Sequence, residues 1–150
     1  MKSHFQKLFA YDSWANQRVI AAMQQLPAPD ERCLHLLSHI FAAQEIWHDR
    51  ITAMPSQISP FLDRNIDGCI VAFNKTAENW AAYLNAADEN EINRSVTYKN
   101  TKGEPFSSKV NDILTHVANH STYHRAQIVS TLKGKIEKLP VTDFIAFARE

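Results

Sequence analysis

The sequence lacks any apolar run that approaches the about 20 residues needed to cross a bilayer. Its first residues, MKSHFQKLFAYDSW, carry polar side chains in every turn and lack the continuous apolar core of a secretory signal. Both absences argue against a membrane span and against export. We therefore expect a cytoplasmic protein with no membrane partner.

An excess of charge of one sign is also missing, because 16 Lys and Arg residues balance 16 Asp and Glu residues. Nucleic-acid binding depends mainly on clustered basic side chains, so this balance argues against a nucleic-acid partner. Cysteine is scarce: Cys33 and Cys69 are far apart and lack the spacing of a metal site. Without an export signal, we expect both thiols to be reduced and buried.

Glycine occurs only three times, and apolar residues recur at helical spacing over long stretches without strand-like alternation. This pattern predicts four amphipathic helices, at residues 3–26, 30–54, 67–87 and from 107 or 108 to 133. Ser3 and Gln6 form a capping-box pattern at the start of the first helix, and Gly134 ends the last. Four such helices commonly bury their apolar faces in a bundle. We therefore expect an all-α fold, a single four-helix-bundle domain over residues 1–150 with a short C-terminal helical segment.

The two long linkers bear on the topology of this bundle. Residues 54–66 can span roughly 40 Å when extended, whereas a helix of 22 residues is only about 33 Å long. This linker is therefore long enough to return along the bundle and allow the second and third helices to run parallel. Residues 88–106 include the strand-like segment SVTY before Lys102 and Gly103, which favours a short hairpin or an ordered cap.

Histidine is the unusual residue of this composition, and three histidines follow one another at intervals of four in the fourth helix. Neighbours among His116, His120 and His124 lie one turn apart on one face, so two of them can share an ion. The outer two are separated by about 12 Å along the axis, which is too far for all three. His124 and His120 lie nearest the centre of the apolar stripe, at roughly 40° and 80°, and His116 lies at roughly 120°. The inward pair is therefore His120 and His124.

A third ligand has to come from another helix, because two protein ligands rarely hold a catalytic ion. The second helix offers His35, His39 and His48, of which His39 borders the apolar stripe. Three imidazoles leave a coordination position open for chemistry, as in catalytic zinc sites. Single histidines in helical bundles are commonly packing residues, and we assign that role to His4, His35 and His48. Helical spacing by itself leaves open whether His39, His120 and His124 bind a metal ion.

A different kind of metal site has to be considered, because Glu45 and His48 form the Glu-x-x-His element of di-iron bundles. Such sites need a second element of this kind and further inward carboxylates, and the fourth helix has none. We also expect Glu45 to point away from the apolar stripe. The sequence therefore argues against a di-iron centre.

Four segments of the chain are familiar: YDSWAN (residues 11–16), LSHI (37–40) continuing to Trp47, HVANHSTYHRAQ (116–127) and LPVTDF (139–144). Together they resemble the DinB/YfiT-like family over nearly the whole chain, and the third segment is the most specific. The resemblance implies a four-helix bundle, often dimeric, with a divalent metal held by one histidine of the second helix and two of the fourth. Carried over, those residues are His39, His120 and His124, the same three that helical geometry selects.

Other polar residues of the first and fourth helices are candidates for supporting roles. Asp12 falls near the middle of the apolar stripe, where an unpaired carboxylate is costly. One hypothesis is that Asp12, with Asn16, orients a ligand imidazole from a second shell around the metal. The alternative is a salt bridge to an arginine or a place at the solvated end of the bundle. Gln127 lies on the side of His120, where it can contact a bound water or serve as an ordinary surface residue.

An aromatic cluster lies outside the core stripe of the first helix. Tyr11, Trp14 and Arg18 point away from that stripe, and such a group can form a dimer face or line a substrate pocket. Exposed aromatic residues without a function are also common.

These observations lead to two functional hypotheses. The first is a metal-dependent enzyme in which imidazole ligands hold Zn²⁺ or Ni²⁺, acting as a hydrolase through an activated water or as a transferase through an activated thiol. The transferase, with a small-molecule substrate and a low-molecular-weight thiol, is favoured by the family resemblance alone. The second is a non-catalytic, metal-bearing interaction module of a stress response.

Overall fold

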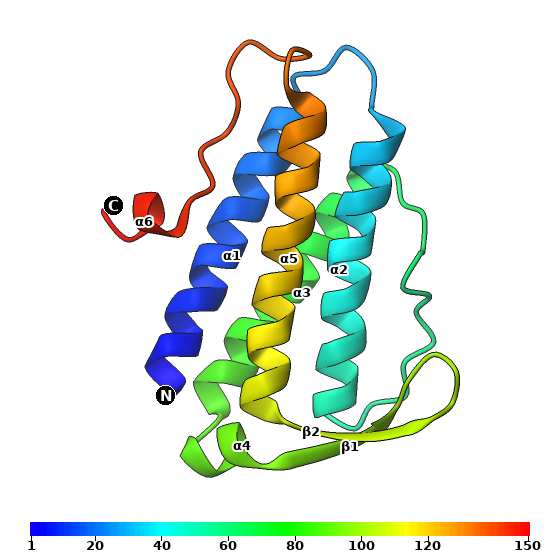
Figure 1. Ribbon diagram of the computed structural model, residues 1–150, viewed down its shortest axis with the longest axis vertical. Helices are drawn as coiled ribbons and strands as arrows, with labels where there is room; N and C mark the ends of the chain where they lie inside the picture. Colours follow the sequence, from blue (N-terminus) through cyan, green and yellow to red (C-terminus); the bar gives the residue numbers. More distant parts are fainter.

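Four long helices make up most of the chain, in agreement with the predicted bundle (Figure 1). The computed structural model describes all 150 residues. The long helices are α1 (Lys2–Met23), α2 (Glu31–Ile51), α3 (Ile66–Ala86) and α5 (Val110–Leu132). The short elements are α4 (Glu89–Asn93), β1 (Ser95–Lys99), β2 (Pro105–Lys109) and the C-terminal α6 (Phe144–Phe147).

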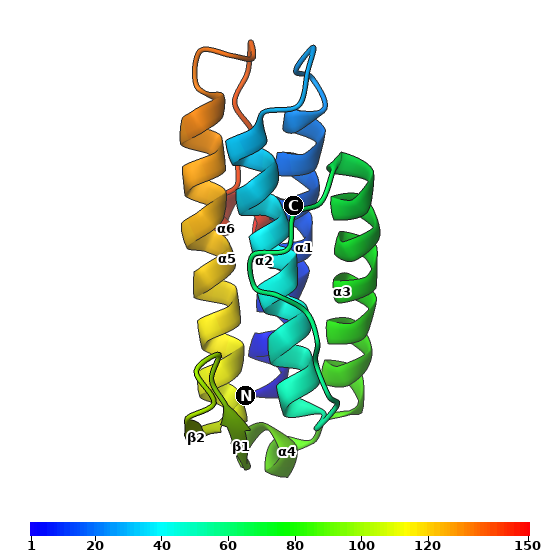
Figure 2. The ribbon, with the colours of Figure 1, turned by 90° about the vertical axis from the view of Figure 1, so that its right-hand side faces the viewer.

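The helices run in two parallel pairs. α1 and α5 point in one direction along the bundle, and α2 and α3 point in the other (Figure 1). Each long helix packs on two neighbours: α2 contacts α3 and α5, and α1 contacts the same two helices. The linker at residues 52–65 runs back alongside α2 before α3 begins (Figure 2). This confirms that a long crossover lets the second and third helices lie parallel.

Local capping chemistry accounts for the starts of α2 and α3 and for the stop after α5, whereas the start of α1 differs from the prediction. The Asp30 and Asn65 side chains accept hydrogen bonds from backbone N–H groups in the first turns of α2 and α3. Gly134 has a φ of 79°, as expected of a residue that closes a helix in the left-handed region. The predicted cap at Ser3 is wrong, because α1 already begins at Lys2 and its cap residue makes no side-chain hydrogen bond.

The segment between α4 and α5 forms the predicted hairpin. β1 and β2 pair antiparallel, with Tyr98 opposite Phe106, and Val96 buries its side chain at the end of the bundle. The start of α5 differs from the prediction, because Ser107 and Ser108 belong to β2 and the helix begins at Val110. Ser107 and Ser108 pair with Thr97 and Val96 of β1, so their backbone is extended and cannot be part of the helix.

The core consists of two apolar clusters separated by a polar layer. One cluster includes Phe9, Trp80 and Val117, and the other includes Val19, Phe41 and Ile128. The residues that lie between them along α1, α2 and α5 are polar and buried: Asp12, Asn16, Gln44, Ser121 and Arg125.

Both cysteines are free and fully buried, as predicted, each in the second of these apolar clusters. None of the helices combines the length and the hydropathy that a membrane span would need.

Candidate metal centre

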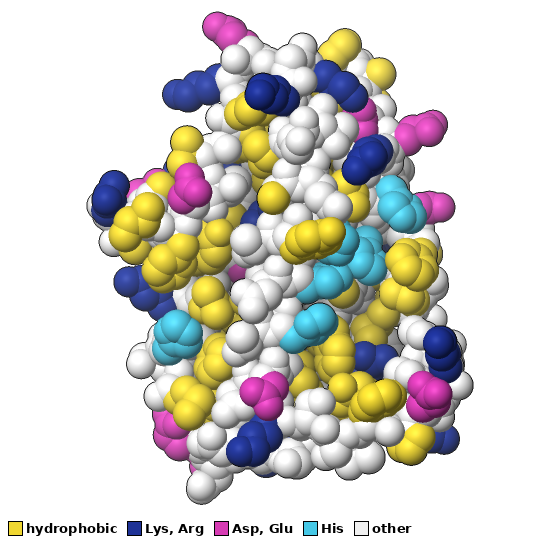
Figure 3. Space-filling view, in the orientation of Figure 1, with side chains coloured by type: hydrophobic (Ala, Val, Ile, Leu, Met, Phe, Trp, Pro, Cys, Tyr) yellow, Lys and Arg dark blue, Asp and Glu magenta, His cyan; other side chains and the backbone are white.

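Three histidines from two neighbouring, antiparallel helices, α2 and α5, meet about halfway along the bundle. His39 comes from α2, and His120 and His124 come from successive turns of α5. One ring nitrogen from each lies within 4.8 Å of the other two, and all three side chains are half-buried. Histidine side chains gather at the centre of this face of the molecule (Figure 3). The structure therefore brings together the three residues that the sequence selected.

The spacing of these imidazoles suits one shared ion. The Nε2 atoms of His39 and His120 are 3.1 Å apart, and the centroid of the His124 ring lies 4.5 Å from that of His120 and 4.8 Å from that of His39. Tetrahedral zinc with bonds of about 2.0–2.1 Å places two ligand nitrogens roughly 3.3 Å apart. The separation of His39 and His120 is close to that value, and the third donor lies within 4.8 Å of both, so the three nitrogens could hold one divalent ion after a modest approach of His124.

The outward nitrogens of two of the rings are already used. His39 Nδ1 lies 2.6 Å from the carbonyl oxygen of Pro60, and His124 Nδ1 lies 2.7 Å from Oε1 of Gln127. Both acceptors require the Nδ1 atom to carry the proton, which leaves the lone pair on Nε2. Metal-binding histidines are commonly oriented in this way by an acceptor behind the ring. Gln127 thus contacts a histidine of the group directly.

The crossover linker forms part of this site. The Phe61 ring lies parallel to the His39 ring, 5.3 Å from it between centroids, and also faces His35 at 6.4 Å. Ser38 donates a hydrogen bond to the carbonyl of Leu62, which holds the linker against α2. Sequence reasoning missed Pro60 and Phe61, because their only signal was a linker long enough to return along the helix.

Burial keeps the imidazoles of α5 neutral. Desolvation, together with smaller effects of the neighbouring His124, His39 and His116, lowers the pKa of His120 to about 4. Desolvation also lowers the pKa of His124, although its hydrogen bond with Gln127 acts in the opposite direction. A neutral imidazole has the lone pair that metal binding needs, and the lowered pKa values favour this form of His120 and His124.

The remaining histidines of the two helices lie outside the group. His116 packs its ring against Trp47, with 5.2 Å between centroids, and His48 packs edge-on against Trp80 at the same distance. His35 is exposed beside Asp63. His48 thus packs as expected, whereas His35 is exposed and does not have the packing role that the sequence analysis gave it.

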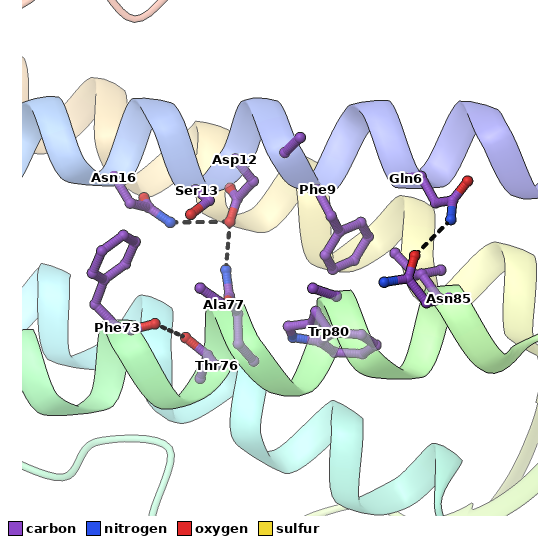
Figure 4. A pocket seen from close by; sticks show the side chains of 14 residues that line it. Gln6, Phe9, Asp12, Ser13, Asn16, Phe73, Thr76, Ala77, Trp80 and Asn85 are labelled. Atoms are coloured by element: carbon purple, nitrogen blue, oxygen red, sulfur yellow. Dashed lines mark hydrogen bonds between the residues drawn. The ribbon is translucent and has the colours of Figure 1, made fainter.

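Asp12 and Asn16 do not support a ligand imidazole, so that hypothesis is wrong. Asp12 forms a buried ion pair with Arg125, which is the salt-bridge alternative, and also accepts hydrogen bonds from Asn16 at 3.0 Å and Gln44 at 2.7 Å. Figure 4 shows Asp12 and Asn16 on the wall of a cavity of about 230 Å³ between α1 and α3. Gln44 also donates to Ser121, so the layer links three helices without reaching the histidines.

Glu45 is buried rather than turned outward, which corrects the prediction for it. Its carboxylate is 6% exposed and pairs with Arg64 of the crossover linker at 2.7 Å and with Lys75 of α3 at 3.1 Å. Both oxygens are occupied by these cations. The residue therefore contributes to helix packing, and the rejection of a di-iron centre stands.

The aromatic cluster of α1 is covered by the C-terminal segment of the same chain. Tyr11 is buried and donates a hydrogen bond to the carbonyl of Thr142, and its ring packs against Phe144 of α6. Trp14 and Arg18 both donate to the carboxylate of Glu150. The C-terminal segment of the same chain therefore covers this aromatic cluster, which lies away from the histidine group.

Comparisons with known proteins point in one direction. The family model described as the DinB family matches residues 1–149. Protein DinB of Bacillus subtilis (strain 168) is 23% identical to the chain over 145 residues, which covers 85% of this chain and 83% of that protein. No solved structure matches this chain.

Proposed function

Because the chain belongs to the DinB family, we propose that it is a metal-dependent enzyme whose ion is held by His39, His120 and His124. The observation that carries this proposal is the convergence of three ring nitrogens, with the outward nitrogens of His39 and His124 bonded to protein oxygens. A packing role alone would not require three imidazoles to face one another.

Zn²⁺ or Ni²⁺ is the resident ion in this proposal. Imidazole nitrogen suits these borderline metals, whereas Ca²⁺ and Mg²⁺ prefer oxygen ligands. No carboxylate or thiol belongs to the histidine group, and both cysteines are buried in an apolar cluster. Three protein ligands would leave at least one position for a substrate or water.

Such an ion supplies an electrophilic centre that lowers the pKa of a coordinated water or thiol toward neutrality. The protein's own contribution is to hold three neutral imidazoles in place. Pro60 and Gln127 fix the ring orientations, and Phe61 covers one side of His39. The family resemblance favours S-transfer from a low-molecular-weight thiol to a small electrophile over hydrolysis. Two free thiols in the core agree with a cytoplasmic setting, which is part of the proposal.

The test compares two reactions on protein that has been stripped with a chelator and reloaded with Zn²⁺ or Ni²⁺. Glutathione with an activated aryl halide reports thiol transfer, and an activated aryl ester reports hydrolysis. We expect metal-dependent transfer that is lost in His39→Gln and kept in His35→Gln, a matched change one turn earlier on α2. Metal-dependent ester cleavage alone would assign a hydrolase. Tight metal binding without turnover in either assay would contradict the enzyme and favour a non-catalytic metal-bearing module.

A further inference from the structure

One arginine near the histidine group, Arg50, is partly withdrawn from solvent but has no carboxylate partner. Arg50, at the end of α2, is half-buried, with its guanidinium over the rings of Trp47 at 4.4 Å and Tyr98 at 4.9 Å. Its one hydrogen bond runs from Nη2 to the carbonyl of Lys99, at 3.2 Å. Desolvation lowers the pKa of Arg50, because its charge is removed from water without a compensating carboxylate.

The other arginines that are withdrawn from solvent are all paired. Arg125 pairs with Asp12, and Arg64 pairs with Glu45. Arg50 makes no ion pair, although a guanidinium has five N–H donors and a charge that is costly to desolvate. Its contact with the faces of two adjoining rings restricts its movement, which is the preorganisation expected of a binding group.

A pocket of about 270 Å³ lies beside this guanidinium, between α2, the crossover linker and the hairpin. Two basic residues, Arg50 and Lys99, belong to its lining, together with the uncharged polar residues Ser56, Asn100 and Thr101. No acidic side chain lines it. The same pocket reaches Pro60, whose carbonyl orients His39.

A row of rings leads from Arg50, on the wall of this pocket, to the histidine group. The centroid of the His116 ring lies 5.7 Å from that of His120 and 5.2 Å from that of Trp47, on which Arg50 rests. His39 and Arg50 are eleven residues apart on α2, about 16 Å along the axis and roughly 20° around it. Both side chains lean toward the N-terminus of α2, and the arginine side chain is the longer one, so the guanidinium lies on the order of 10–15 Å from the imidazoles. In Figure 3, hydrophobic side chains and Lys or Arg side chains lie on the same face below the histidines.

We propose that the molecule bound at the histidine centre is an elongated organic anion, with its reacting head at the three imidazoles and its carboxylate or similar group on Arg50 and Lys99. This inference rests on the proposed function, because the head needs an open position on the ion. The aromatic row would contact the apolar middle of such a molecule. A charge-assisted hydrogen bond is worth about 1.5–3 kcal/mol, so the anionic end should improve affinity about 10- to 100-fold.

Calorimetric titration of the zinc-loaded protein tests this assignment with two probes of equal length. One probe is ω-mercaptoundecanoate, and the other is ω-mercaptoundecanol, which has the same thiol and chain but no charge. We expect the carboxylate to bind at least about 10-fold more tightly to the wild type. In Arg50→Met, which keeps an apolar stem against the rings, the difference should fall below about 3-fold. Arg18→Met is the matched control, because Arg18 also stacks on a tryptophan, Trp14, but pairs with Glu150 on another face.

Each outcome decides something different. Equal affinity of the two probes for the wild type, or an equal effect of Arg18→Met and Arg50→Met, would overturn the anion site and leave the metal centre intact. Failure of both probes to bind, or binding that does not change when zinc is removed, would overturn the open metal position and the anion site with it. If Arg50→Met does not fold, Lys99→Met tests the same pocket from the exposed hairpin, and a loss of about 2-fold or more in the preference for the carboxylate is expected.

Discussion

The bundle contains two groups of buried polar side chains that differ in one respect. In the polar layer around Asp12 and Arg125, every polar side chain has a partner within the layer or on a neighbouring side chain. In the histidine group, the outward nitrogens of two rings are bonded, but the inward nitrogens face only one another. The first arrangement is complete without a ligand, whereas the second gathers three ring nitrogens around a common point. Both groups are withdrawn from solvent, so burial does not distinguish them. What distinguishes a packing network from a binding site is whether each polar atom already has a hydrogen-bond partner within the protein.

The largest effect on stability should come from breaking the polar layer around Asp12 and Arg125. Asp12→Ala should lower the free energy of unfolding by about 3–5 kcal/mol, because it leaves the charge of Arg125 buried without its partner. The affinity for zinc should not change in the fraction that folds. Urea unfolding with and without metal measures both quantities. Lys75→Met, which removes an exposed partner of Glu45, serves as the control and should cost less than about 1 kcal/mol. A loss of zinc affinity in Asp12→Ala would show that the two groups are coupled.

Removing a histidine of the metal centre should have the opposite effect: metal binding should be lost while the stability of the metal-free protein changes little. Zinc at a concentration 100 times its dissociation constant should stabilise the wild type by about 2.7 kcal/mol, and this gain should vanish in His120→Ala. The metal-free stability of the variant should stay near that of the metal-free wild type, since His120 has no hydrogen-bond partner outside the histidine group. Thermal unfolding with zinc and with a chelator provides the measurement. A zinc-dependent gain that persists in His120→Ala would mean that the ion binds elsewhere.

A smaller effect should follow from removing the group behind one ring. Gln127→Leu removes the acceptor of His124 Nδ1 and should weaken zinc binding by about 10- to 100-fold without abolishing it. Competition with a chromogenic chelator gives the dissociation constant. Gln44→Leu is an informative contrast, because Gln44 belongs to the polar layer and its loss should leave the constant unchanged.

The smallest effect concerns pH in the absence of metal. His120 has a pKa of about 4 in the folded chain, below the usual value of 6.5, so between these values the unfolded state binds more protons. Stability should therefore fall as the pH drops from 6.5 toward 4. The His120 share amounts to at most about 2 kcal/mol at pH 5, and solvent screening of this half-buried ring reduces it. Urea unfolding of the metal-free protein at pH 7 and 5 should show a weaker pH dependence for His120→Gln than for the wild type. An identical dependence would contradict the assigned shift.

The sequence predicted most of this architecture because helical periodicity is a local signal. The four helices, the crossover, the hairpin and the choice of His120 and His124 over His116 all follow from spacing along one element or from linker length. The choice of His39 followed from its angle on α2. In each case the information lies within a single segment of chain.

What the sequence did not predict depends on contacts between distant segments. Asp12 was recognised as a buried carboxylate, but its partner Arg125 lies 113 positions away. Glu45 was placed outside because the helix periodicity could not show that Arg64 and Lys75 would cover it. Pro60 contributes a backbone carbonyl to the site, and a backbone group carries no signal in the residue type.

The most direct test of the account is the X-ray absorption spectrum of zinc bound to the full chain. The account predicts three imidazole nitrogens at about 2.0–2.1 Å and at least one further oxygen from solvent, with the imidazole signal reduced in His39→Gln. A spectrum with sulfur ligands, with four protein ligands, or with an unchanged imidazole signal in His39→Gln would contradict it.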